Sequence, residues 1–134
     1  MNKTIQELYG LNQRKESEQD YALDYWYNQL ITKTVDKIDI EDASIMLSQR
    51  LFVELAIEKA IEFLLVDPLA GEKYDGQLLE LLYFIDLNEF NDLPRLKNLL
   101  HRINSNLMNI EWFDEEDKKE YCKLLDEFTK KVHK

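Results

Sequence analysis

Apolar residues recur along most of the chain at the spacing expected of amphipathic helices. In the segment 17–31, four large apolar side chains fall on one helical face: Leu23, Tyr27, Leu30 and Ile31. This spacing predicts a helix over 17–31. We expect Trp26 and Tyr27 to pack in the core. An outward-facing Tyr25 or Tyr21 is a candidate anchor for a protein interface.

Two further helices are predicted between residues 40 and 66. Asp39 is a good N-cap acceptor in front of an acidic first turn, so a helix is expected to begin at about Ile40. A second, more apolar stretch begins at Leu51 and ends at Val66, before an Asp-Pro pair. Because it is the most apolar stretch, we expect it to form the central helix.

A loop that holds two of the three glycines follows this central helix. It runs from Pro68 to Gly76. Asp75 is a candidate N-cap of the leucine-rich helix expected at 78–82. Tyr74 lies in the loop beside Glu72 and Asp75. Of the aromatic residues, it is therefore the better candidate for an interface anchor.

Two amphipathic helices complete the predicted set. The first is expected to begin near Pro94, and its apolar stripe consists of Leu96, Leu99, Leu100, Ile103 and Leu107. The second follows Asp114, with Asp117 spaced as the first-turn acid behind an N-cap. Its stripe consists of Tyr121, Leu124, Leu125, Phe128 and Val132.

The scarcity of chain-reversing residues decides the fold class. Three glycines and two prolines among 134 residues are too few for the frequent turns of a β-sandwich or barrel. The length is that of one compact domain. The sequence therefore predicts an all-α fold, a single domain over residues 1–134 built as a bundle of roughly six helices.

The charge of the chain is strongly acidic and concentrated in one region. Twenty-seven acidic residues face seventeen basic ones, and the formal net charge is −10. Residues 36–92 alone carry fourteen acidic and four basic side chains. Because phosphate backbones and anionic membranes repel such a surface, we expect neither nucleic acid nor membrane as a partner, but a basic protein.

Three glutamates, Glu54, Glu58 and Glu62, follow one another at helical spacing in the acidic region. Like charges at this spacing repel each other, and a cationic partner would relieve the repulsion. The alternative interpretation is an ordinary solvated face, balanced by Lys59 or by a basic side chain of another helix. The spacing alone leaves both interpretations open.

The residues of common catalytic and metal sites are missing from the sequence. His101, His133 and Cys122 are the only histidines and cysteine, and their spacing builds no zinc or di-iron site. No nucleophile with a base and no glycine-rich phosphate loop is present. We therefore expect that the protein is not an enzyme and binds neither a metal nor a cofactor. A lone thiol and an N-terminus without an apolar leader favour the cytoplasm.

Three segments of the chain resemble a family of α-helical immunity proteins from bacterial contact-dependent growth inhibition (CDI) systems. They are Ile38–Gln49, Glu54–Ala60 and Asp67–Leu79, where a glycine-containing acidic loop precedes a leucine-rich helix. The resemblance implies a small cytoplasmic protein without catalysis of its own. Such proteins bind the C-terminal toxin domain, often a nuclease, that a neighbouring cell delivers.

The charge and the resemblance together favour an inhibitor that occludes a basic toxin through its acidic surface in a one-to-one complex. We expect this toxin to be a nuclease, and more specifically an RNase. The candidate contact residues are Glu41, Asp42, Glu58, Glu62, Glu72, Tyr74 and Asp75. An alternative is an acidic adaptor or nucleic-acid mimic that regulates a basic host protein. A third hypothesis, an enzyme for a cationic small molecule, requires a cleft with perturbed carboxylates.

Overall fold

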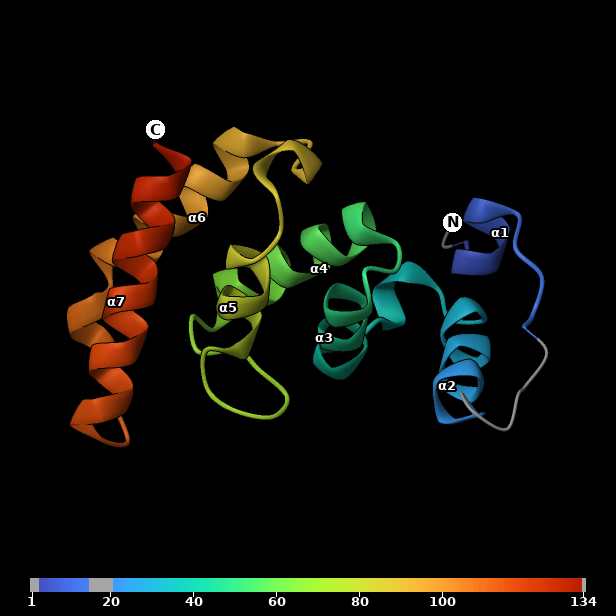
Figure 1. The fold of residues 1–134 in the computed structure, drawn as a ribbon, viewed down its shortest axis with the longest axis horizontal. Coiled ribbons are helices and arrows are strands. Elements are labelled where there is room, and N and C mark those ends of the chain that lie inside the picture. The colour runs from blue at the N-terminus through green and yellow to red at the C-terminus, as the bar shows by residue number, and fades with distance from the viewer. Residues whose placement is uncertain (1–2, 15–20, 134) are drawn as a thin grey trace. The chain divides into compact units, whose positions relative to one another are not determined.

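The computed structural model describes residues 3–14 and 21–133, and within these ranges the chain forms helices joined by loops, without a β-strand (Figure 1). The all-α prediction is confirmed, with 69% of the described residues in helices. The α-helices of the described ranges are α1 (Ile5–Tyr9), α2 (Tyr21–Ile31), α3 (Ile40–Gln49), α4 (Val53–Val66), α5 (Gln77–Tyr83), α6 (Leu93–Ser105) and α7 (Glu115–Val132). Short 3-10 turns are η1 (Val35–Lys37), η2 (Leu87–Glu89) and η3 (Leu107–Asn109).

The chain divides into two compact units, Met1–Asp42 and Ala43–Lys134. The first turn of α3 belongs to the first unit, and the rest of this helix belongs to the second. The prediction that residues 1–134 form a single domain stays a prediction.

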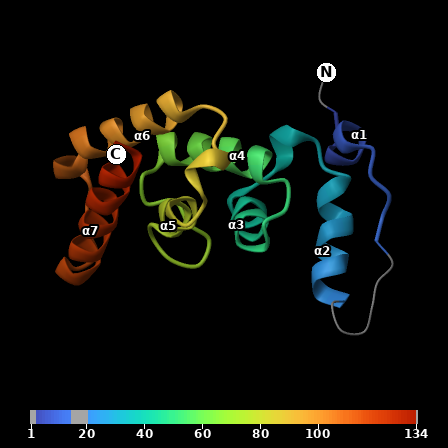
Figure 2. The ribbon, with the colours of Figure 1, turned by 45° about the horizontal axis from the view of Figure 1, so that its top comes forward.

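The first unit contains a short helix, α1, that the hydrophobic pattern does not predict. A reciprocal capping box stabilises it: the Thr4 hydroxyl accepts the Glu7 N–H at 3.1 Å, and the Glu7 carboxylate accepts the Thr4 N–H at 3.2 Å. Helix α1 lies at the C-terminal end of α2 (Figure 2), where the Ile5 N–H donates to the Lys33 carbonyl at 3.0 Å. Because α1 is so short, the Thr-x-x-Glu spacing is its main sequence signal.

Helix α2 buries the face that the sequence predicts. Tyr27, Leu30 and Ile31 are each at most 6% exposed, whereas Tyr25 is 51% exposed. Trp26 is half-buried. The predicted first turn, residues 17–20, and the side chain of Tyr21 lie outside the described part of the chain.

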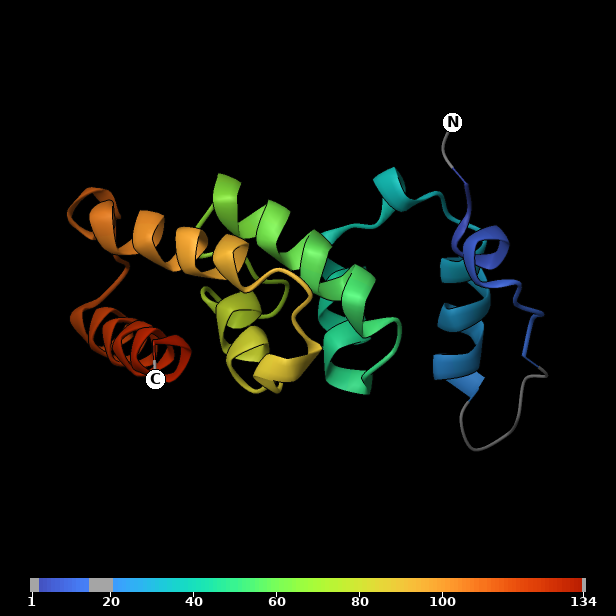
Figure 3. The ribbon, with the colours of Figure 1, turned by 90° about the horizontal axis from the view of Figure 1, so that it is seen from above.

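The second unit contains the helices α4 to α7 in a closed arrangement. Helix α4 packs against α5 and α6, and α7 packs against the same two helices. Figure 3 shows α4 and α6 running side by side. The core of these four helices is formed by Ala56, Ile57, Ala60, Ile61, Leu64, Leu78, Leu79, Leu82, Leu96, Leu99, Leu100, Ile103, Leu125 and Phe128, each at most 4% exposed.

The starts of the helices mostly follow the predicted caps. The carboxylate of Asp39 accepts the Asp42 N–H at 2.8 Å in α3, and Asp114 accepts the Asp117 N–H at 2.8 Å in α7. In α6, the cap is Asp92, which accepts the Arg95 N–H at 3.0 Å. These bonds satisfy amides that lack a partner within the helix.

Two details of the predicted elements were wrong. Helix α5 begins at Gln77, and its N-cap is Gly76 without a side-chain cap, so Asp75 does not cap it. Helix α6 ends at Ser105, and Leu107 lies in η3 instead of extending the apolar stripe. Together with α1, which raises the number of α-helices in the described ranges to seven, these are local differences from the predicted bundle.

Candidate functional site

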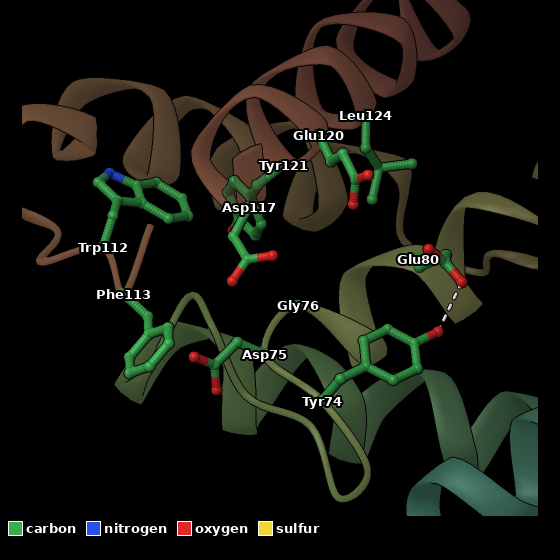
Figure 4. Close-up of a pocket in the computed structure, with 10 residues that line it drawn as sticks. All are labelled: Tyr74, Asp75, Gly76, Glu80, Trp112, Phe113, Asp117, Glu120, Tyr121 and Leu124. Atoms are coloured by element: carbon green, nitrogen blue, oxygen red, sulfur yellow. Dashed lines mark hydrogen bonds between the residues drawn. The ribbon is translucent and has the colours of Figure 1, made fainter. Parts of the chain in front are cut away.

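A pocket of about 630 Å³ opens in the second unit between two walls. One wall is the loop between α4 and α5 with the start of α5, and the other is α7 with the segment that precedes it. The lining residues are Tyr74, Asp75, Gly76, Glu80, Trp112, Phe113, Asp117, Glu120, Tyr121 and Leu124. In Figure 4, Asp117 and Glu120 reach from α7 toward the loop side, where Asp75 and Tyr74 lie.

The loop wall owes its shape to Gln77 and Gly71. The buried side-chain carbonyl of Gln77 accepts the N–H groups of Glu72 and Lys73, both at 2.9 Å. Gly71 approaches the same region so closely that a Cβ atom there would lie 2.1 Å from the Tyr74 carbonyl oxygen and 2.8 Å from the Gln77 Cβ. This closed turn presents Tyr74 on the outside of the loop.

The floor of the pocket is the buried ring of Tyr121. Its hydroxyl donates to the Pro68 carbonyl at 2.7 Å, which ties α7 to the loop. Gly76 adopts φ +88°, and a Cβ there would lie 3.1 Å from the Tyr121 ring, so glycine suits both the backbone and the contact. The Trp112 ring packs on Tyr121 with centroids 5.2 Å apart. Burial, and then the charge of Asp67, raise the pKa of Tyr121 well above its ordinary value, so the hydroxyl stays neutral.

Four carboxylates line the pocket, and no Lys, Arg or His is among the described residues that line it. Glu80 accepts the Tyr74 hydroxyl at 2.6 Å. This hydrogen bond, together with burial and the Glu80 charge, raises the pKa of Tyr74 to about 12. Asp75, Asp117 and Glu120 form no ion pair within the described part of the chain. The pocket therefore gathers negative charge that no ion pair among the described residues neutralises.

Aromatic side chains stand at both ends of this acidic pocket. Trp112 and Phe113 lie at one end and Tyr74 at the other (Figure 4). Phe113 is 93% exposed and Tyr74 is 49% exposed. Exposed large apolar groups beside polar ones are typical of protein-interaction surfaces.

The structure brings together two of the residues predicted from the sequence, Tyr74 and Asp75. Both line the pocket. Glu72 lies in the same loop and is exposed, but its side chain is not part of the lining. The interpretation of this loop as an interaction segment thus gains a defined geometry.

Glu58 and Glu62 lie on α4, and each has a basic partner within the second unit. Glu58 pairs with Arg95 of α6, and Glu62 pairs with Lys59 at 3.0 Å. These contacts agree with the interpretation of the glutamate row as a charged surface balanced by Lys59 and by a basic side chain of another helix. A cationic partner is therefore not required to explain Glu58 and Glu62.

Glu41 and Asp42 lie in the first turn of α3, in the first unit, and differ in exposure. Glu41 is exposed, whereas Asp42 is 4% exposed. The Asp42 carboxylate accepts the Lys33 ammonium at 2.6 Å and the Trp26 indole N–H at 3.1 Å. Asp42 thus holds α2 and the start of α3 together, a role that the sequence-based choice of contact residues did not foresee.

The Asp42 ion pair leads to a prediction for stability. Burial alone raises the pKa of Asp42, but the bonds from Lys33, the Asp39 N–H and Trp26 outweigh it, and the net shift is downward. Asp42→Asn is expected to lower the free energy of unfolding by about 2 kcal/mol at pH 7, because a hydrogen-bonded charge pair is lost. The measurement is urea unfolding of both proteins as a function of pH.

The expected pH dependence follows from the direction of the two shifts. The pKa of Asp42 is lowered in the folded protein, so its ion pair stabilises the fold fully above about pH 4, the pKa of an unfolded aspartate. This stabilisation is lost as the pH falls through the pKa of the folded state. The raised pKa of Lys33 keeps its ammonium charged in alkaline solution, so the stabilisation by the ion pair persists there and is lost only as the pH rises through this raised pKa. Glu41→Gln is the matched control and is expected to change stability by less than about 0.5 kcal/mol. An Asp42→Asn effect that persists unchanged at pH 2 would contradict the assignment.

The groups that commonly build catalytic or metal sites are dispersed. Within residues 3–14 and 21–133, no three His, Cys, Asp or Glu side chains are arranged to hold a metal ion. His101 is exposed and Cys122 is half-buried in α7. Among the described helices, none has the length and apolar character needed to cross a membrane.

Comparison with protein families identifies the chain. A family model described as CDI immunity proteins matches residues 7–100. The chain belongs to this family. The resemblance drawn from the three sequence segments is thereby confirmed. No match was found among curated proteins.

Membership of the CDI immunity protein family defines the class of partner. Its members are typically inhibitors rather than enzymes, and the family implies a cognate CDI toxin as the partner. The matched residues include the loop wall of the pocket, from Tyr74 to Glu80, whereas the α7 wall lies beyond residue 100. The pocket thus combines a segment inside the family match with one outside it.

Four lining residues on the second wall were missed by the sequence analysis: Trp112, Phe113, Asp117 and Glu120. Two signals were available. Trp112 and Phe113 form an aromatic pair just before a helix cap, and Asp117 and Glu120 lie three positions apart on one helical face. Residues 93–134 are nearly neutral overall, with nine basic and eight acidic side chains, so counting charge by region hides these carboxylates.

Proposed function

We propose that this CDI immunity protein binds and neutralises the C-terminal toxin domain of its system by stoichiometric occlusion through an acidic surface. The observation that carries the proposal is the acidic, aromatic-edged pocket in a member of an inhibitor family. We further propose that the toxin is a nuclease, with an RNase as the first candidate, and that inhibition takes place in the cytoplasm.

The charge of the protein supports a nuclease as the target. An enzyme that binds a phosphate backbone must carry positive charge along its substrate groove. The inhibitor has a formal net charge of −10. Opposite potentials steer the two proteins together and raise the association rate, and contacts at the groove exclude the substrate.

The proposed surface is centred on the loop between α4 and α5, with Glu72, Tyr74 and Asp75 as contact residues. Glu58 and Glu62 of the same unit stay as candidates for outer contacts, each with a basic neighbour already in place. Glu41 belongs to the first unit and stays a separate candidate contact. Asp42 is left out because its carboxylate is buried and bonded. An interface of standard size buries about 1,600 Å² in total, so the loop region supplies only part of it.

Toxicity rescue in bacteria tests the proposed function. The probe is the C-terminal domain of the large secreted protein encoded next to this chain, expressed from an inducible promoter. Co-expression of the immunity protein is expected to restore growth, and the purified pair is expected to form a one-to-one complex with a Kd of about 1 nM or below. Growth curves, light scattering after size exclusion and calorimetry provide the measurements.

The control is an unrelated CDI toxin domain of a different sequence, which the immunity protein is expected not to neutralise. Inhibition of RNA cleavage by the purified toxin in proportion to added immunity protein would support occlusion of a nuclease. If the immunity protein neither rescues growth nor binds the toxin, the proposal is contradicted. That outcome would favour the acidic adaptor that regulates a basic host protein.

A further inference from the structure

We propose that the pocket between α5 and α7 receives an arginine side chain of the toxin domain. The inference rests on the proposed function and specifies where and how the toxin is held. The argument uses the shape of the pocket, its unbalanced charge and its aromatic edges.

The pocket has the size and construction of a side-chain receptor. Its volume of about 630 Å³ lies in the range of small-ligand sites. The hydrogen bonds of Gln77 fix the loop wall, and the Tyr121 hydroxyl bonded to Pro68 fixes the floor. A preformed receptor lowers the entropic cost of binding because few of its own groups must become ordered.

The charge of the walls selects a cation. Asp75 on the loop wall and Asp117 and Glu120 on α7 approach the same space from opposite sides (Figure 4). Within the described part of the chain, none of the three has an ion-pair partner. A positively charged group between the walls would relieve their mutual repulsion and form charge-assisted hydrogen bonds.

The aromatic edges favour arginine over lysine. Trp112 and Phe113 at one end, and Tyr74 at the other, offer ring faces beside the carboxylates. A guanidinium group is planar, stacks on aromatic rings and donates two parallel hydrogen bonds to a carboxylate, whereas an ammonium group is a compact, strongly hydrated point charge. The combination of rings and carboxylates therefore matches guanidinium best.

Charge also argues against a second copy of the chain as the occupant. Two molecules with a formal net charge of −10 each repel one another. A basic toxin domain is the complementary partner, and the family already implies a toxin.

The test compares two double variants of α7 in binding to the toxin domain encoded next to this chain. Asp117→Asn with Glu120→Gln removes two carboxylates from the pocket. Glu115→Gln with Asp126→Asn removes two from the opposite face of the helix, since residues advance by about 100° each. Both variants change the net charge equally. Circular dichroism and thermal unfolding establish that both are folded.

The two variants are expected to differ in the dissociation rate. The pocket variant is expected to raise koff at least about tenfold, because a buried charge on the toxin loses its partners. The control variant is expected to lower the association rate modestly at low salt and to leave koff unchanged. Surface plasmon resonance at low and high salt separates these rates. Equal koff values for both variants would overturn the inference.

A double-mutant cycle identifies the inserted side chain. Each exposed arginine and lysine of the toxin is replaced by alanine and measured against the wild-type and pocket-variant immunity proteins. One arginine is expected to show a large loss with the wild type and almost none with the pocket variant. Arg→Lys at that position is expected to recover less than half of the lost binding free energy. A coupled lysine in place of an arginine would overturn the choice of guanidinium.

The outcomes separate this inference from the proposed function. Failure of the wild-type protein to bind or rescue against the toxin would overturn the proposed function and, with it, the pocket assignment. Tight binding and rescue by the wild type, with no arginine coupled to the pocket carboxylates, would overturn the pocket assignment alone. A homodimer that the pocket variant dissolves would likewise overturn it, in favour of a second copy.

Discussion

Gly71→Ala is expected to lower the free energy of unfolding by about 2–3 kcal/mol and to weaken toxin binding at least about tenfold. The added methyl group would lie 2.1 Å from the Tyr74 carbonyl oxygen and 2.8 Å from the Gln77 Cβ. The first of these atoms belongs to the backbone, so a side-chain rotation does not remove the clash. The loop must move, and it carries Tyr74 and Asp75 with it.

Gly71→Ala is expected to affect toxin binding because hydrogen bonds connect its loop to the wall of the pocket. Gln77 accepts two loop N–H groups, and Gly76 donates to the Leu69 carbonyl at 2.8 Å. A displaced Gly71 therefore disturbs hydrogen bonds that fix the pocket wall. Urea unfolding measures the stability, and surface plasmon resonance with the cognate toxin domain measures the binding.

Gly10→Ala is the matched control for Gly71→Ala. Gly10 has a φ of +62°, but a Cβ there meets no atom within 4 Å. Its substitution is expected to cost about 1 kcal/mol for the left-handed backbone and to leave toxin binding unchanged. If Gly71→Ala were no more harmful than Gly10→Ala in both measurements, the tight loop would not be required for the site.

Phe128→Ala is expected to lower the free energy of unfolding by about 3–5 kcal/mol, the largest effect of any substitution discussed. The ring is fully buried in α7 and packs edge-on against Tyr83 of α5 with centroids 5.5 Å apart. Its removal leaves a cavity between these helices. Native proteins have a total free energy of unfolding of only about 5–15 kcal/mol, so this loss is a large fraction of it. Thermal and urea unfolding measure the loss.

Phe113→Ala is the matched control, because the same side chain is 93% exposed there. Its effect on stability is expected to stay within about 0.5 kcal/mol, whereas toxin binding is expected to weaken about fivefold, since Phe113 edges the pocket. The two phenylalanines thus separate folding from recognition. A loss of binding with Phe128→Ala but none with Phe113→Ala, in proteins that are both folded, would contradict this division.

The packing of the helices in the second unit supports the two walls of the pocket. Helices α5 and α7 each contact the core formed with α4 and α6. The pocket walls project from these two helices and from the segments that adjoin them. Two hydrogen bonds to Gln77 hold the loop wall in place, and the other wall includes α7, which packs against α5 and α6.

The sequence by itself determined the fold class and most helix boundaries. Scarce glycine and proline, helical spacing of apolar residues and the caps at Asp39 and Asp114 are local features, and local features decide where helices form. The same spacing predicted the buried positions Leu30, Ile31 and Phe128. The family was also identifiable, because its motifs are continuous in sequence.

Ion pairs and hydrogen bonds between specific residues on different elements could not be predicted from these local features. The pairing of Glu58 with Arg95 and the bonds of Asp42 to Trp26 and Lys33 join residues on different elements. For Asp42, these bonds replace the predicted role of a contact residue with that of a structural link. Charge counted along the chain gives no sign of it.

Only the tertiary structure decided where the candidate site lies. Asp75 and Asp117 are 42 positions apart in the sequence, the first in a strongly acidic region and the second in a nearly neutral one, yet they line one pocket. The packing of α5 against α7 and the Tyr121 hydrogen bond to Pro68 bring the two walls together. Helix formation depends on neighbouring residues, whereas a pocket depends on which helices pack against each other, and that contact is absent from the local pattern.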